Sequence, residues 1–134
     1  MRKPDNPELT IEDMEKSRID GGSFDHEAHV YTAWLYLERY PVTEAIERYT
    51  SALKRLTLKL GVPGKYHETI TWFFMLIIAE RSKGIAKHDW NAFKAANDDL
   101  LRREDNVLNR YYSKETLATN AARRSFVLPD RLVA

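Results

Sequence analysis

Three of the four histidines in the sequence lie beside the expected starts of two helices. His26 and His29 stand three residues apart in the segment FDHEAHV, and His67 lies in KYHETIT. A spacing of three residues puts two side chains on one face of a helix. His67 precedes Ile70 by three residues and Thr71 by four, which places it at the inner edge of its own helix. The first chemistry to consider is therefore that of several imidazole side chains brought close together.

The three histidines have the composition of a metal site. Three neutral imidazoles with an open coordination position suit a catalytic Zn²⁺, and imidazole with carboxylate also suits Fe, Mn, Co or Ni. Such a metal lowers the pKa of a bound water and supplies a nucleophile. Neighbouring carboxylates and Tyr66 can orient the ligands or move protons. We predict a divalent-metal site formed by His26, His29 and His67, with Glu68 and Tyr66 as catalytic residues acting on an unknown small molecule.

Two other interpretations of these histidines stay open. Histidines near helix ends often bind a buried carbonyl or carboxylate, so the three can instead form a hydrogen-bonded polar layer with Tyr66, Glu68 and Thr69. A metal-free acid–base or ligand-binding site is the second alternative, and Lys65 allows its ligand to be an anion. The zinc-protease motif H-E-x-x-H is excluded, because Thr71 stands where its second histidine is needed.

Glycine and proline divide the chain into helix-length segments and leave no convincing strand. The run ITWFFMLIIA is rich in β-branched and aromatic residues, but it lies in eighteen residues without glycine or proline, which exceeds the usual strand length. We predict an all-α, single-domain bundle of about five to six helices, with this apolar helix at its centre and an extended C-terminal tail from Phe126. The expected helices cover 10–19, 24–40, 43–60, 66–83, a fifth that Asp89 caps and that breaks near 105–106, and 113 to about 122.

Chain order brings the histidines to one end of this bundle. The helix over 43–60 returns antiparallel to the helix over 24–40, so the helix over 66–83 runs parallel to the latter. Both histidine-bearing helices therefore begin at the same end. We expect a polar pocket there.

Composition limits the classes of function. The chain has 134 residues, 43% of them hydrophobic, no cysteine and a formal net charge of +1. The absence of cysteine excludes disulfides, thiolate zinc sites and iron–sulfur clusters, and the near-zero charge argues against nucleic acid as a partner. The longest apolar run is too short to span a membrane, and the first 25 residues lack the apolar run of about 7 to 15 residues that a signal peptide needs. We expect a cytoplasmic protein without a membrane partner.

The charge is unevenly distributed along the chain. Residues 1–29 carry eight acidic and four basic residues, a net charge of −4, whereas the remainder is net basic. We expect an acidic N-terminal segment over 1–22, which includes a short helix, and a helical bundle domain over 23–134. The asymmetry predicts that the acidic segment docks on the body or on a second subunit.

A second pattern supports a different class of function. Tyr36, Ala45, Tyr49 and Ala52 stand at the offsets of a tetratricopeptide helical hairpin. Only one such unit fits, whereas about three are needed for a stable solenoid, so we expect a single helix pair packed by its alanines. The alternative function is thus a non-catalytic interaction module that forms a homo-oligomer or binds a partner helix.

Four motifs together resemble a family of small helical bacterial proteins. The resemblance covers about 24–132 and implies a small bacterial helical protein, but the family has no established activity and assigns no catalytic residue here. It leaves 1–22 as a variable extension. The motifs are F-x-H-x-x-H-x-x-x-A-W-x-Y-L from Phe24, KYHETITW from Lys65, YYS from Tyr111 and ARRSFVLPDR from Ala122.

Overall fold

The predicted all-α class is confirmed by a computed structural model, which describes residues 9–131. No strand occurs within this range. The chain there forms nine α-helices and two 3₁₀ helices: α1 (Ile11–Glu15), η1 (Gly21–Ser23), α2 (His26–Arg39), α3 (Val42–Lys59), η2 (Pro63–Lys65), α4 (Glu68–Ser82), α5 (Trp90–Ala96), α6 (Asp98–Leu101), α7 (Leu108–Tyr111), α8 (Lys114–Leu117) and α9 (Asn120–Arg124).

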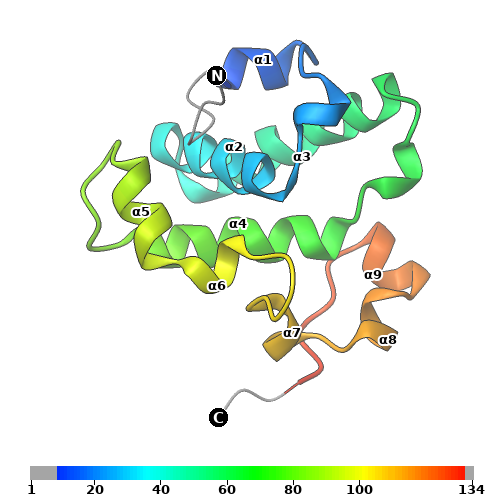
Figure 1. Cartoon of the computed structure of the whole chain (residues 1–134). Helices are drawn as coiled ribbons and strands as arrows, with labels where there is room; N and C mark the ends of the chain where they lie inside the picture. The colour runs from blue at the N-terminus through cyan, green and yellow to red at the C-terminus, as the bar shows by residue number, and fades with distance from the viewer. Residues whose placement is uncertain (1–8, 132–134) are drawn as a thin grey trace.

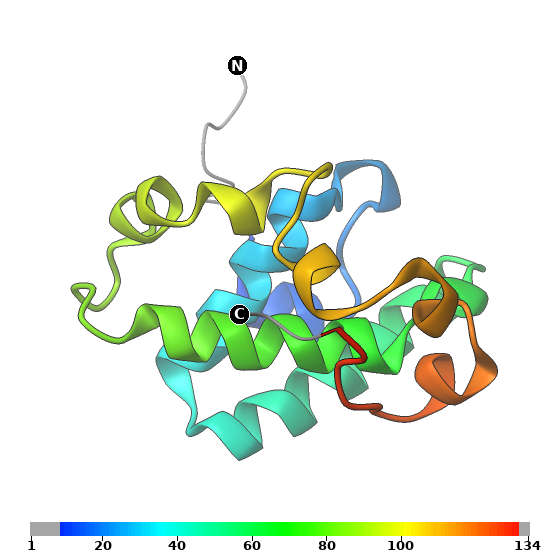
Figure 2. The ribbon, with the colours of Figure 1, turned by 90° about the horizontal axis from the view of Figure 1, so that it is seen from below.

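The apolar helix α4 lies at the centre of the fold, as predicted. It runs between the α2–α3 pair on one side and α7, α8 and α9 on the other (Figures 1 and 2). Met75 and Ile78 are fully buried, and Phe73 is nearly so. A helix that is apolar nearly all round needs covering on several faces, which explains this layered arrangement. Of the described helices, none combines the length and hydrophobicity required to cross a membrane.

The α2–α3 pair is joined tightly by the residues that suggested a tetratricopeptide hairpin. Tyr36, Ala45, Tyr49 and Ala52 are all buried, and the Tyr36 and Tyr49 rings meet edge to face with centroids 5.2 Å apart. Pro41 ends α2 and precedes the first turn of α3. These four side chains therefore pack inside the fold, and a partner would have to bind another face of the hairpin.

The N-terminal segment docks on this helix pair. The Thr10 hydroxyl caps α1 by accepting from the Asp13 amide at 3.0 Å, and Met14 is fully buried against α2 and α3. The helix ends at Glu15 rather than at Ile19, because Ser17 adopts a left-handed conformation with φ of 53° that interrupts the turn. Residues 1–8 of the predicted acidic segment lie outside the described residues.

The predicted fifth helix is divided into α5, α6 and α7. The expected break near residues 105–106 is confirmed, since Asp105 has a φ of 52°. A further break at Asn97 was not predicted; its side-chain amide donates to the Phe93 carbonyl at 2.8 Å and replaces a helical hydrogen bond.

The predicted sixth helix is likewise two short helices. Ser113 caps α8, and Thr119 caps α9 by accepting from the Ala122 amide at 3.1 Å. The extended tail then returns to α4, where the Thr69 hydroxyl donates to the Ser125 carbonyl and accepts from the Val127 amide. Residues 132–134 of the predicted tail lie outside the described range.

Burial of α4 should dominate the stability of the fold. Ile78→Ala removes a fully buried side chain and should lower the free energy of unfolding by about 2–5 kcal/mol. Leu76→Ala, on the same helix but 41% exposed, should lower it by less than about 1 kcal/mol. Urea unfolding followed by tryptophan fluorescence measures both, and equal losses would contradict the central position of α4.

Candidate functional site

The starts of α2 and α4 lie at the same end of the fold, as chain order predicts. In Figure 1 both helices begin on the right and run to the left. Phe24 and His29 near the start of α2 line the same cavity as Tyr66 and His67 at the start of α4. The structure thus brings together two of the three predicted metal ligands and one of the two predicted catalytic residues.

This cavity has a volume of about 460 Å³ and lies between η1, the C-terminal half of α3, η2 and the start of α4. A smaller hollow of about 80 Å³ adjoins it and is lined by His26 and His29. His29 and Ile70 line both spaces. The wall of the larger cavity is mostly apolar, with side chains from Phe24, Leu53, Leu56, Leu60, Val62 and Ile70.

His67 is the residue that starts α4. Its Nδ1 accepts from the Ile70 amide at 3.2 Å and so caps the helix, while its Nε2–H donates to the Leu117 carbonyl at 2.8 Å. These two bonds require the neutral tautomer with the proton on Nε2. Both nitrogens of this buried ring are therefore bound to the protein and leave no lone pair for a metal.

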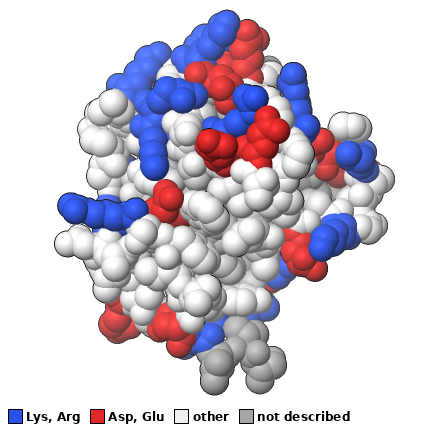
Figure 3. All heavy atoms as spheres, turned by 180° about the vertical axis from the view of Figure 1, so that it is seen from behind, with Lys and Arg blue, Asp and Glu red and all other residues white. Residues whose placement is uncertain are grey.

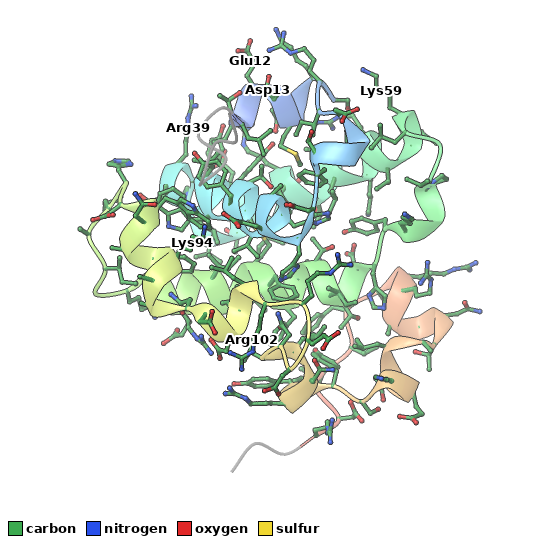
Figure 4. All side chains as sticks on the ribbon, viewed as in Figure 1. Glu12, Asp13, Arg39, Lys59, Lys94 and Arg102 are labelled. Carbon is green, nitrogen blue, oxygen red and sulfur yellow. The ribbon has the colours of Figure 1, made fainter. Side chains whose placement is uncertain are left out.

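His26 performs a similar structural role at the start of α2. Its Nε2–H donates to the Leu100 carbonyl at 2.9 Å, and this carbonyl also accepts from the Asn106 side-chain amide at 3.0 Å. Arg102 (labelled in Figure 4) holds the loop that carries Asn106, because its guanidinium binds the Asp105 carbonyl and the Asp98 carboxylate. His26 thereby ties α2 to α6, whose Leu100 carbonyl also binds the loop that carries Asn106.

His29 differs from both. No described residue forms a hydrogen bond with its ring, which instead lies against Phe24 with centroids 4.1 Å apart. Burial first, and then the charge of His26, lower the pKa of His29 to about 4. At neutral pH its imidazole is uncharged and presents one donor and one acceptor at the cavity wall.

Glu68 and Tyr66 form a closed hydrogen-bonded pair. The Tyr66 hydroxyl donates to Glu68 Oε1 at 2.6 Å, and the Trp72 indole donates to Oε2 at 3.0 Å. Burial, followed by the bond to Glu68, raises the pKa of Tyr66 well above its ordinary range. Lys54 also lies 3.7 Å from Glu68 Oε1. Both carboxylate oxygens of Glu68 are thus hydrogen-bonded outside the cavity. Glu68 lines a third space, and His29 does not line that space.

The described residues contain no group of three or more His, Asp or Glu side chains arranged to hold a metal ion. Such a group would require His67 to release either the Ile70 amide or the Leu117 carbonyl, whereas His26 binds its carbonyl through Nε2 alone. The divalent-metal site formed by His26, His29 and His67 therefore stays a prediction from the sequence.

Sequence reasoning did not identify the apolar part of the site. The cavity wall comes from α3 and from the turn around Val62 as much as from the histidine segments. Gly21 also approaches it closely, since an added Cβ would lie 3.3 Å from Leu60 Cδ1. These residues carry no motif, and only the tertiary structure brings them to one place.

Comparison with protein-family models, with curated proteins and with solved structures finds no match to this chain. The function is accordingly argued from the geometry of the cavity.

The contributions of the two hydrogen bonds of His67 to the free energy of unfolding can be measured separately. His67→Ala removes the cap of α4 and the bond to Leu117, and it should lower the free energy of unfolding by about 2–3 kcal/mol. His67→Asn supplies a favourable capping oxygen but is too short to reach Leu117, so it should recover about 1 kcal/mol. Urea unfolding compares the variants. An asparagine variant no more stable than the alanine variant would contradict the capping role.

His29 should make stability depend on pH. Its folded pKa of about 4 lies below the ordinary value of 6.5, so the unfolded chain takes up the proton first as pH falls. The stabilisation is fully present above pH 6.5 and should decline by about 3 kcal/mol as pH falls to about 4. His29→Leu should remove this part of the dependence. An NMR titration midpoint of His29 near 6.5 would contradict its burial as a neutral ring.

Proposed function

We propose that the protein binds a small molecule with an apolar body in the cavity between α2, α3 and α4. The observation that carries the proposal is His29, a half-buried neutral imidazole without a hydrogen-bond partner among the described residues, in the wall of an apolar space of about 460 Å³. Apolar cavities with a few convergent polar groups are typical of small-molecule sites.

The polar groups of the wall are almost all engaged with the protein. The Thr57 and Thr71 hydroxyls donate to backbone carbonyls, Tyr66 donates to Glu68, and both nitrogens of His67 are bonded. Among the polar side chains that line the cavity, His29 and Lys65 remain available. Lys65 is exposed, whereas the ring of His29 lies against Phe24.

This arrangement defines the chemistry of the ligand. The apolar wall favours a hydrocarbon or aromatic body, since burial of apolar surface is the main source of affinity. The neutral imidazole of His29 can donate one hydrogen bond and accept another, which suits a hydroxyl, an amine or a carbonyl group. A buried polar group that is satisfied only by the ligand gives selectivity for ligands that carry such a group.

Each of the two functions predicted from the sequence would need structural features other than those that support ligand binding. A metal-dependent enzyme would need His67 as a ligand, although both of its ring nitrogens form hydrogen bonds within the described structure. An interaction module would need a face of the α2–α3 pair other than its buried tyrosines and alanines. We favour ligand binding because its determinants are present without rearrangement.

The uncharged fluorescent probe N-phenyl-1-naphthylamine tests the proposal. Its aromatic body suits the apolar wall and its amine can bond to His29, so we expect saturable binding with one molecule per chain. Thr57→Phe places a ring in the cavity and should weaken binding by about tenfold or more, through lost apolar contact. Leu60→Trp narrows the same cavity from a partly exposed position and serves as a second variant if Thr57→Phe does not fold.

Thr43→Phe is the matched control, because Thr43 is exposed on α3 and does not line the cavity. It should bind the probe like the original protein, and EDTA should leave binding unchanged. Equal affinity of the Thr43 and Thr57 variants would exclude the cavity as the binding site. Loss of binding in EDTA would instead favour the metal site.

A further inference from the structure

A second hollow, of about 400 Å³, lies beside the cavity across the η2 turn. Val62 and Lys65 of this region line the cavity, whereas Pro63 and Gly64 line the hollow. Three cationic side chains surround the hollow: Lys54 from α3 and Arg123 and Arg124 from α9. We propose that this hollow binds a phosphate group, either free phosphate or the phosphate of a small phosphomonoester.

Two of the three cations are held in position by the protein. The Lys54 ammonium lies 3.7 Å from Glu68 Oε1 and 5.2 Å from the centre of the Tyr66 ring. The Arg123 guanidinium donates to the Gly64 carbonyl. Groups that are already oriented lose less conformational entropy when a ligand binds, so these contacts favour anion binding.

The hollow carries an excess of positive charge. Glu68 is the one carboxylate among the described residues that line it, and both of its oxygens accept hydrogen bonds from Tyr66 and Trp72. Neither Arg123 nor Arg124 forms an ion pair with a carboxylate of the described residues. On the rear face of the molecule, Lys and Arg side chains gather at the upper left, with Asp and Glu side chains among them (Figure 3).

The donor set fits a phosphate better than a carboxylate. A guanidinium offers a planar pair of donors, which matches two phosphate oxygens, and an ammonium adds a compact charge. Asn120 also lines the hollow and can add an uncharged side-chain donor. Three cations balance a phosphate dianion together with the charge of Glu68, whereas a carboxylate would leave one positive charge uncompensated.

NMR of the ¹⁵N-labelled full chain at pH 7.5 and constant ionic strength tests the site, with inorganic phosphate and glycerol phosphate as separate probes. We expect saturable shifts confined to the amides of 63–66 and 119–124. Tighter binding of glycerol phosphate would identify an ester as the ligand, and equal binding would identify the phosphate group alone. Absence of shifts beyond those caused by sodium chloride would overturn the proposal.

Three variants connect the shifts to the hollow. Arg124→Gln removes an exposed charge that forms no hydrogen bond or ion pair with another described residue, and it should weaken phosphate binding by about tenfold. Arg123→Lys keeps the charge but loses the planar pair of donors, and it should weaken binding by about fivefold. Arg103→Gln removes an exposed arginine away from the hollow and should change affinity by less than about twofold. An equal effect of Arg103→Gln and Arg124→Gln would show that only the overall charge attracts the anion.

Discussion

The burial of α4 is the constraint on which the other features depend. Because α4 is apolar nearly all round, helices must cover it on opposite sides, and the chain provides α2 and α3 on one side and its C-terminal third on the other. Helix packing leaves the ends of α4 as the places where polar groups must be satisfied. At its start, His67 satisfies an amide of the first turn and a carbonyl from α8 with one ring.

This constraint also explains why the three histidines have different roles. His67 and His26 each connect the start of a helix to a carbonyl far along the chain, at Leu117 and Leu100. These two rings thus bind carbonyls as histidines near helix ends often do, but neither bonds to Tyr66, Glu68 or Thr69, so the predicted polar layer is not formed as such. His29 differs from both, because its ring forms no hydrogen bond with a described residue and lines the two spaces between α2, α3 and α4. The candidate site arises because one half-buried polar group at this end has no hydrogen-bond partner among the described residues.

Much of the fold could be predicted because helix periodicity and capping are local. The capping role of Asp89 and the central place of the apolar helix follow from short segments of sequence. The breaks at Asn97 and Ser17 could not, because each depends on a side-chain bond or a backbone conformation that tertiary packing selects. The shared end of the two histidine-bearing helices followed from chain order alone. The carbonyls that bind His26 and His67 were beyond prediction, since they come from α6 and α8, which lie 74 and 50 residues further along the chain.

The central claim is that His29 lines a ligand cavity and has no hydrogen-bond partner among the described residues, and it can be tested by locating a bound probe. Intermolecular nuclear Overhauser effects between N-phenyl-1-naphthylamine and the labelled protein report the contacts directly. We expect them from the probe to the rings of Phe24 and His29 and to the methyl groups of Ile70, which line the cavity. Contacts only to exposed apolar side chains such as Leu76 or Leu128, with none to His29, would contradict the account.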